Sequence, residues 1–317
     1  MEKRRIYFNE ELHSYTDELG NKYTSTTTLI SNYYEKFKAI EIAEACERIG
    51  KNPRHPKYLK YKGKSKKQLL YEWDQTKDIA CEKGTKKHNY FEDSIRSATG
   101  YKLINNQYIN DRIYTLDDVI GDRKIGLINI EYFESKGIKE KYPIIFNVIH
   151  KLTQAGYLIY AEIGVYDPIN LISGLIDVLL IRGNEFIILD WKTNAAPIMF
   201  ESGYFDKDER GILTDKFITK VETFHDPISY IPASVGHKYS MQLSGYAEMT
   251  ERFGFIYKGS ILCHIRSIEA GIIDKLNNVD KEEVKLINVL DLRTEFKKIK
   301  EHHYNLNHMK EPKLTLF

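Results

Sequence analysis

The stretch "SGLIDVLLIRGNEFIILDWKTN", residues 173–194, constrains the fold more than any other part of this 317-residue chain. Two strongly apolar runs flank a central Gly-Asn pair, which is typical of a two-residue β-hairpin turn. With that pair as the loop, the register places Asp177 directly opposite Asp190, with Cβ atoms roughly 4.5–5.5 Å apart. Lys192 follows on the same face as Asp190, because side chains alternate along a strand.

Two like charges that face each other in a half-buried sheet destabilise it unless a cation lies between them. Oxygen ligands favour a hard divalent cation such as Mg²⁺ or Mn²⁺. A neighbouring Lys can stabilise negative charge that develops during a reaction. The hairpin therefore predicts a metal site suited to phosphodiester hydrolysis. The structural alternative is an exposed Asp–Lys pair at the end of a strand.

The composition argues against a membrane protein, a secreted protein and an iron–sulfur protein. Hydrophobic residues make up 42% of the chain, which is enough for a sizeable core. No apolar run reaches the roughly 18–20 residues that span a bilayer, and "MEKRRIYFNEE" lacks the apolar segment of a signal peptide. The three cysteines are far apart, which excludes a four-cysteine iron–sulfur cluster. We expect a cytoplasmic protein with no membrane partner.

Strand-like and helix-like patterns alternate along the chain, which predicts an α/β fold. The residues between 195 and 236 show no regular pattern. Strands are expected in a hairpin near the N-terminus, over 157–192 and over 259–267, and helices over 39–50, 67–80, 85–98, 140–155, 238–253 and 284–306.

The D-x(12)-D-x-K spacing on a hairpin resembles the PD-(D/E)XK nuclease superfamily, and "GLIDVLL" and "IILDWKTN" are similar to its RecB-like exonuclease branch. Two further motifs of that branch occur in order, G-x-x-x-H at Gly84–His88 and Q-x-x-x-Y at Gln242–Tyr246. The N-terminal "HSYTDELGNKYTSTTTLI" also resembles the lead-in of phage and prophage nucleases of this kind. The resemblance implies a restriction-endonuclease-like α/β core, a small mixed sheet flanked by helices, with N-terminal hairpin and helical additions.

The same resemblance implies how the chain is organised. The whole of 1–317 would be one elaborated nuclease domain. Its parts would be an N-terminal hairpin with helices over 1–80, a catalytic core over 84–265, and a C-terminal helix and tail over 280–317.

The resemblance also implies the metal site. Asp177 and Asp190 would be the metal carboxylates, with His88 and the backbone carbonyl of Trp191 as further ligands. Lys192 would be the catalytic lysine. The cofactor would be one or two Mg²⁺ or Mn²⁺ ions.

Three residues outside the hairpin motif receive supporting roles from the resemblance. Gln242 and Tyr246 are four residues apart on one helix face and would lie near the active site and the nucleic-acid backbone. Packing in the core is the alternative for both. Glu162, on the strand before the hairpin, would support the metal ligands, with an ordinary acid at a sheet edge as the rival interpretation.

Residues 51–67 contain eight Lys or Arg and no acid, although the whole chain has a net charge of only +2. Lysine side chains can neutralise phosphates, and interleaved tyrosines can stack on bases. The segment therefore either contacts nucleic acid or is a solvated loop. The lysines assigned to nucleic acid in the first case are Lys57, Lys60, Lys62 and Lys64.

Taken together, these features predict a metal-dependent DNA nuclease. The resemblance favours an exonuclease that acts on DNA ends in phage or bacterial recombination, repair or DNA processing. A structure-specific endonuclease and a non-catalytic nucleic-acid-binding or assembly protein are the alternatives. The sequence does not fix polarity, the choice between DNA and RNA, or the oligomeric state.

The chain ends in "KLTLF", Lys313 to Phe317. This pentapeptide resembles the Q-L-x-L-F peptide by which bacterial replication proteins dock on the sliding clamp, except that Lys313 replaces Gln. It would either dock on a clamp or pack against the rest of the chain.

Overall fold

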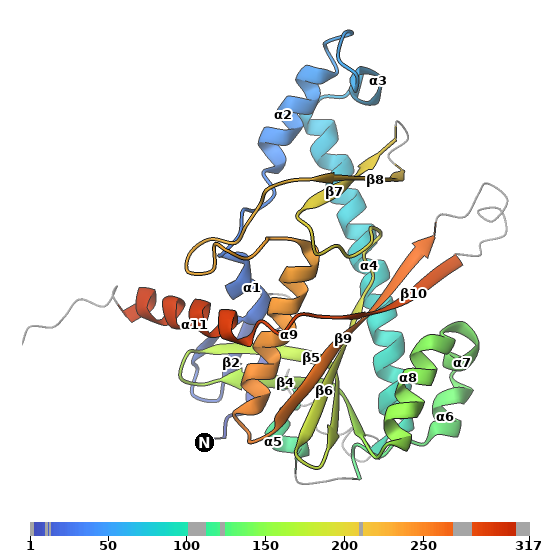
Figure 1. Ribbon diagram of the computed structural model, residues 1–317, viewed down its shortest axis with the longest axis vertical. Coiled ribbons are helices and arrows are strands. Elements are labelled where there is room, and N and C mark those ends of the chain that lie inside the picture. Colours follow the sequence, from blue (N-terminus) through green and yellow to red (C-terminus); the bar gives the residue numbers. More distant parts are fainter. Residues whose placement is uncertain are drawn as a thin grey trace, which may run out of the picture.

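A computed structural model describes residues 3–9, 12, 14–100, 112–120, 124–208, 212–268 and 281–308. The fold is α/β, with a mixed sheet flanked by helices (Figure 1). The strands are β1 Ile6–Asn9, β2 Ser14–Asp17, β3 Lys22–Ser25, β4 Leu158–Asp167, β5 Ile172–Arg182, β6 Glu185–Lys192, β7 Gly203–Lys207, β8 Leu213–Thr219, β9 Ile256–Ile268 and β10 Lys281–Asn288. The helices are α1 Thr26–Ser31, α2 Ala39–Ile49, α3 Tyr58–Tyr61, α4 Lys66–Ala98, α5 Leu116–Val119, α6 Ile130–Ser135, α7 Ile138–Lys141, α8 Pro143–Gln154, α9 Val235–Glu251 and α11 Arg293–His308.

The main sheet has the strand order β1-β2-β3-β5-β6-β9-β10, and β4 pairs with β5. Its centre is the predicted hairpin, β5 and β6. Their pairing runs from Arg182↔Glu185 to Val178↔Leu189, which is the register expected from a Gly-Asn turn. The strand β6 then pairs in parallel with β9, and β9 pairs antiparallel with β10. The hairpin predicted near the N-terminus is present as β2 and β3, which pair across the turn at 18–21.

Each face of the sheet has its own apolar core. Side chains of α1, α9 and α11 pack against one face, which includes Leu179 and Ile188. Side chains of α4, α6, α7 and α8 pack against the other face, which includes Val178 and Leu189. Neighbouring residues of one strand therefore serve opposite cores, as the alternation of side chains requires.

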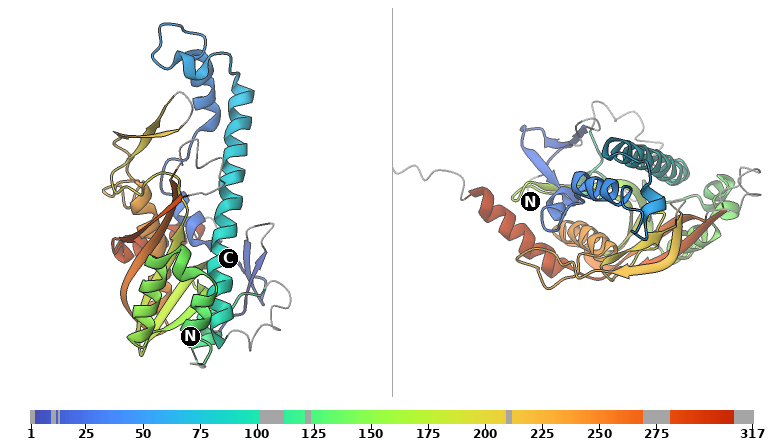
Figure 2. Two further views of the ribbon diagram at one scale, coloured as in Figure 1. Left: turned by 90° about the vertical axis from the view of Figure 1, so that its right-hand side faces the viewer. Right: turned by 90° about the horizontal axis from the view of Figure 1, so that it is seen from above.

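The helix α4 is 33 residues long and runs along the long axis of the molecule, with α2 beside its N-terminal half (Figure 2). The sequence predicted two helices, 67–80 and 85–98, and this separation is wrong because Gly84 lies inside α4. A Cβ atom at Gly84 would lie 3.1 Å from Thr193 Oγ1, so the missing side chain lets α4 come close to the end of β6. Glycine costs a helix interior only about 1 kcal/mol, and tertiary packing readily outweighs that cost.

Two other predictions of local structure are also wrong. The long final helix expected over 284–306 begins only at Arg293, because the residues before it form β10 and pair with β9 from Glu282↔Ser267 to Asn288↔Ile261. The segment expected to be irregular after residue 195 contains the ribbon β7–β8, in which the rings of Phe205 and Phe217 lie 5.0 Å apart. Both errors concern strands that are recognised only by their pairing, β10 with β9 and β7 with β8.

The residues 39–76, which we call the tower, comprise α2, α3 and the first part of α4. They extend beyond the sheet at one end of the molecule (Figure 1). A small apolar cluster of Ala43, Cys46 and Leu69 joins α2 to α4. The tail Lys313 to Phe317 lies outside the described residues. Within the described part of the chain, no helix combines the length and apolarity needed to cross a membrane.

Candidate active site

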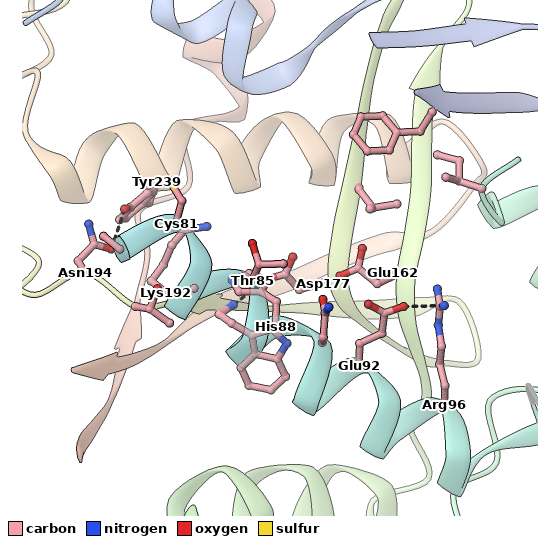
Figure 3. Close-up of a pocket in the computed structure, with 18 of the residues that line it drawn as sticks. Cys81, Thr85, His88, Glu92, Arg96, Glu162, Asp177, Lys192, Asn194 and Tyr239 are labelled. Atoms are coloured by element: carbon pink, nitrogen blue, oxygen red, sulfur yellow. Dashed lines mark hydrogen bonds and ion pairs between the residues drawn. The ribbon is translucent and has the colours of Figure 1, made fainter. Parts of the chain in front are cut away.

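A cleft of about 1170 Å³ lies between α4 and the strands β4, β5 and β6 (Figure 3). Helix α9 contributes Tyr239 to its wall. The functional groups that line the cleft come from α4, β4, β5, the end of β6 and α9. They are Cys81, His88, Glu92, Arg96, Glu162, Asp177, Lys192, Asn194 and Tyr239.

Three of the predicted site residues meet in this cleft. One ligand atom from each of His88, Glu162 and Asp177 lies within 4.8 Å of the other two. The Nδ1 atom of His88 is 3.5 Å from Oδ2 of Asp177. The structure therefore brings together a helical imidazole and two carboxylates from neighbouring strands.

The two carboxylates owe their position to an irregularity shared by β4 and β5. The pairs Ala161↔Val178 and Ile163↔Ile176 keep one register on either side, so Glu162 stands opposite Asp177. Glu162 has a φ of 53°, a left-handed conformation that costs a non-glycine residue of order 1–3 kcal/mol. At this point both strands change the core to which their side chains belong. The strain turns Glu162 toward His88 and Asp177.

The electrostatics of the cluster favour a bound cation. Burial, followed by repulsion from Asp177 and Glu92, raises the pKa of Glu162 well above its usual range. Burial, followed by repulsion from Asp190, does the same to the pKa of Asp177. Burial also lowers the pKa of His88, which keeps the imidazole neutral and able to act as a ligand.

Asp190 takes a different position from the one predicted. The paired register stops at Val178↔Leu189, one step before the two aspartates. Asp177 Oδ2 accepts a hydrogen bond of 2.8 Å from the backbone N–H of Trp191, while Asp190 Oδ2 lies 2.6 Å from Lys192 Nζ. The carboxylate of Asp190 is thus beside the cluster, close enough to raise the pKa of Asp177, but outside the group of three.

Lys192 is held between opposing influences. Burial alone would lower its pKa, but attraction to Asp190 and Asp177 outweighs burial and raises the pKa. Its side chain is 14% exposed at the cleft wall. A charged amine is therefore fixed next to the carboxylate cluster.

Trp191 contributes its backbone to the site and its ring to the core. Burial lowers the pKa of the His88 imidazole, and a hydrogen bond with the Trp191 backbone partly offsets that effect. The indole is buried and stacks on Phe91 with ring centroids 4.6 Å apart. This stacking aligns the end of β6 with the turn of α4 that carries His88.

The donor set fits a divalent cation. Two carboxylates and a neutral imidazole, with the Asp190 carboxylate beside them, suit Mg²⁺ or Mn²⁺. The mutual repulsion of the acids also favours a bound cation, because a positive charge between them would relieve that repulsion. The described cysteines offer no alternative cluster, since Cys46 and Cys263 are buried apart from the exposed Cys81.

The Q-x-x-x-Y pair does not reach the cleft. Gln242 Nε2 donates a hydrogen bond of 2.8 Å to Tyr246 Oη, and neither residue lines the cleft. Tyr246 is buried in the core beside Gly174, where a Cβ would lie 2.2 Å from its ring. The alternative of core packing describes Tyr246 better than contact with nucleic acid. Tyr239, one turn earlier on α9, reaches the cleft instead.

Sequence reasoning missed several residues of the cleft. Glu92 pairs with Arg96 at 2.5 Å, and burial raises the pKa of Glu92. Its place four residues after His88 puts both on one face of α4, a spacing that could have revealed it. Tyr239 and Asn194 carry no comparable signal, because their role depends on how α9 packs beside β6.

The basic segment is not a free loop. Lys57 pairs with Asp206 at 3.3 Å, and Lys60 Nζ donates to the Lys207 carbonyl at 2.8 Å, so both lysines dock on β7. Lys64 pairs with Glu72 at 2.7 Å. Lys62 lies over the Tyr58 ring at 5.7 Å. Protein groups thus occupy these lysines in the tower.

Comparisons with known proteins give this cleft no assignment. No protein-family model matches the chain, and a search of curated proteins finds no match.

Proposed function

We propose that the chain is a metal-dependent deoxyribonuclease of the PD-(D/E)XK type. The observation that carries this proposal is the meeting of His88, Glu162 and Asp177 in one cleft beside Lys192. A solvated Asp–Lys pair would not need a strained glutamate opposite a second acid. The arrangement of β4, β5, β6 and β9 between α4 and α9 also supports a restriction-endonuclease-like core.

The residues divide into a binding set and a reacting set. Asp177, Glu162 and His88 would hold the cation, and Asp190 and the Trp191 carbonyl would complete its coordination. The ion would supply Lewis-acid stabilisation of the scissile phosphate and activation of the attacking water. Glu162 and Asp177 keep raised pKa values until a cation neutralises their repulsion.

Lys192 would act on the charge that develops at the phosphate. Its ammonium lies 2.6 Å from Asp190, one residue beyond the Trp191 backbone that contacts His88. When Asp190 coordinates a cation, the amine becomes available to a phosphate oxygen at the same wall of the cleft. Removing one such electrostatic donor typically costs 10²–10³ in rate.

We further propose exonuclease action on DNA ends, in recombination, repair or DNA processing in a bacterial or phage-infected cell. The decisive experiment incubates purified protein and Mn²⁺ with linear DNA and with covalently closed circular DNA. Degradation of the linear DNA alone is expected. Asp177→Asn, which keeps the shape of the side chain, is the matched control and should be inactive.

Other outcomes point to the alternatives. Cleavage of the closed circle would establish an endonuclease. Binding of DNA without any cleavage, at every Mn²⁺ or Mg²⁺ concentration, would refute the proposal in favour of a non-catalytic binding protein.

A further inference from the structure

We infer that Tyr239 is the positioning residue of Lys192, and that helix α9 acts on the active site through Tyr239 and not through Gln242. The inference rests on the proposed nuclease function for its kinetic consequence. Its geometric basis is independent of that function.

The ring of Tyr239 faces the amine of Lys192. The Nζ atom of Lys192 lies over the ring, 4.8 Å from its centroid. A cation over the face of an aromatic ring is attracted by the quadrupole of the ring. Lys192 thus has two partners on two elements, Asp190 on its own strand and Tyr239 on α9.

The ring itself is held in place. The Tyr239 hydroxyl donates a hydrogen bond of 2.8 Å to Oδ1 of Asn194. The backbone carbonyl of Asn194 in turn accepts a hydrogen bond of 2.9 Å from Nε2 of His264 on β9. A ring fixed at its hydroxyl end presents a constant face to Lys192.

The two partners of Lys192 differ in what a bound cation would do to them. The Asp190 carboxylate would be a metal ligand in the proposed function, so coordination would draw it away from the lysine. The Tyr239 ring has no charge to offer a hard cation and stays with the amine. It would therefore hold Lys192 at the cleft wall in the state in which the reaction takes place.

The position of Tyr239 on α9 explains why Gln242 is not needed there. The side-chain amide of Gln242 donates its hydrogen bond to Tyr246 on the same helix. Tyr239 lies one turn before Gln242 on α9 and is one of the residues that line the cleft. Within the described residues, α9 has no other side chain in the lining of the cleft.

The first test measures turnover of linear DNA. Tyr239→Leu should lower kcat about tenfold with little change in KM, because a cation–π contact is worth of order 1 kcal/mol or more when partly desolvated. Tyr239→Phe keeps the ring and should retain most of the turnover. Tyr34→Leu is the matched control, because Lys238 lies over the Tyr34 ring at 3.8 Å outside the cleft. That variant should leave kcat unchanged.

The second test needs no activity. A small acylating reagent, followed by mass spectrometry, reports how often Lys192 leaves its place. Tyr239→Leu should raise the modification rate of Lys192 several-fold, and Tyr239→Phe should not. If Tyr239→Leu fails to fold, Tyr239→Met, which fills more of the space of the ring, carries the same expectation.

The outcomes separate the two ideas. A wild-type protein that never cleaves DNA would refute the proposed function, while the modification rates would still decide the role of Tyr239. Unchanged modification of Lys192 in Tyr239→Leu, or an equal loss of kcat in Tyr239→Phe and Tyr239→Leu, would overturn the inference.

Discussion

Two Lys–Asp pairs, one in the cleft and one between the tower and β7, have the same chemistry and different surroundings. Lys192 and Asp190 are 2.6 Å apart, with side chains 14% and 2% exposed. Lys57 and Asp206 are 3.3 Å apart, with side chains 42% and 23% exposed. Breaking a buried pair leaves an uncompensated charge, whereas an exposed pair exchanges its partner for water. The two pairs have the same charges, so the difference in their burial should decide how much each contributes to stability.

The surroundings extend the contrast. At the cleft, four acids, Glu92, Glu162, Asp177 and Asp190, lie near the amine of Lys192. Burial and then repulsion raise the pKa values of Glu162 and Asp177. In the tower, lysines alternate with acids from neighbouring segments, as in the pairs of Lys64 with Glu72 and Lys66 with Glu44. The acids of the cleft repel one another unless a cation binds between them. These lysines of the tower are already paired with acids. Four measurements test this contrast.

The largest difference should appear in turnover. Lys192→Ala should lower kcat on linear DNA by about 10²–10³, because it removes a fixed donor of positive charge at the reacting phosphate. Lys57→Ala should leave kcat unchanged under saturating DNA. Single-turnover kinetics in Mn²⁺ measures both, and equal turnover of the two variants would remove Lys192 from the mechanism.

Stability should separate the pairs next. Lys192→Ala should lower the free energy of unfolding by about 3 kcal/mol at pH 7, because it leaves the buried Asp190 without its cation. Lys57→Ala should cost less than about 1 kcal/mol. Urea denaturation of the metal-free proteins provides the comparison, and a similar midpoint for both variants would contradict the importance of burial.

The pH dependence of stability should also differ between the regions. The pKa values of Glu162 and Asp177 are higher in the folded chain than in the unfolded chain, so the folded state binds more protons between the two values. Their contribution is therefore full below the unfolded pKa of about 4 and is lost as the pH rises toward the folded pKa. The slope is at most about 1.4 kcal/mol per pH unit for one group.

Glu162→Gln should flatten this loss of stability as the pH rises above the unfolded pKa of about 4. Saturating Mn²⁺ should flatten it in the wild-type protein, because a cation replaces the protons. Glu134→Gln, at an exposed pair with Lys139, serves as the control. If the free energy of unfolding depended on pH equally in wild type and Glu162→Gln, the raised pKa of Glu162 would be refuted.

The smallest effect concerns DNA binding by the tower. Replacing Lys57, Lys60, Lys62 and Lys64 with Ser removes at most four phosphate contacts, each worth about 0.7–0.9 in the salt slope. Because three of these lysines already bind protein groups, the slope should change by about 1 or less. A change near 3, measured by fluorescence anisotropy at several salt concentrations, would restore the segment as a nucleic-acid contact.

Local signals in the sequence predicted the parts of the fold that depend on local chemistry. The Gly-Asn turn set the register of β5 and β6, and that register is confirmed up to Val178↔Leu189. The low helix propensity of Gly84 predicts a break between two helices. Its place inside α4 depends on the close approach to Thr193, more than a hundred residues away. The strand β10 was missed for a similar reason, since only pairing with β9 distinguishes it from a helix.

The residues of the candidate site also fall into two groups, those that the sequence predicts and those that depend on packing. His88, Asp177 and Lys192 could be found because motif spacing reports them, and all three line the cleft. The strained backbone of Glu162 and the cleft-facing side of α9 leave no mark in the spacing of residues. Gln242 followed the motif but bonds to Tyr246, because the rotation of α9 about its axis is set by packing on the sheet.

The close approach of Gly84 to Thr193 has a mechanical consequence. Helix α4 is continuous from Lys66 to Ala98, and a tilt of the whole helix would pivot at this close approach. At a rise of about 1.5 Å per residue, the arm to Lys66 is about 27 Å and the arm to His88 about 6 Å. A swing of the far end by about 4 Å would shift His88 by about 1 Å, enough to change a rate by about 10². Under the proposed function, the tower would therefore be the long arm of a lever on His88, and a partner bound at its tip would change the geometry of the metal site from a distance.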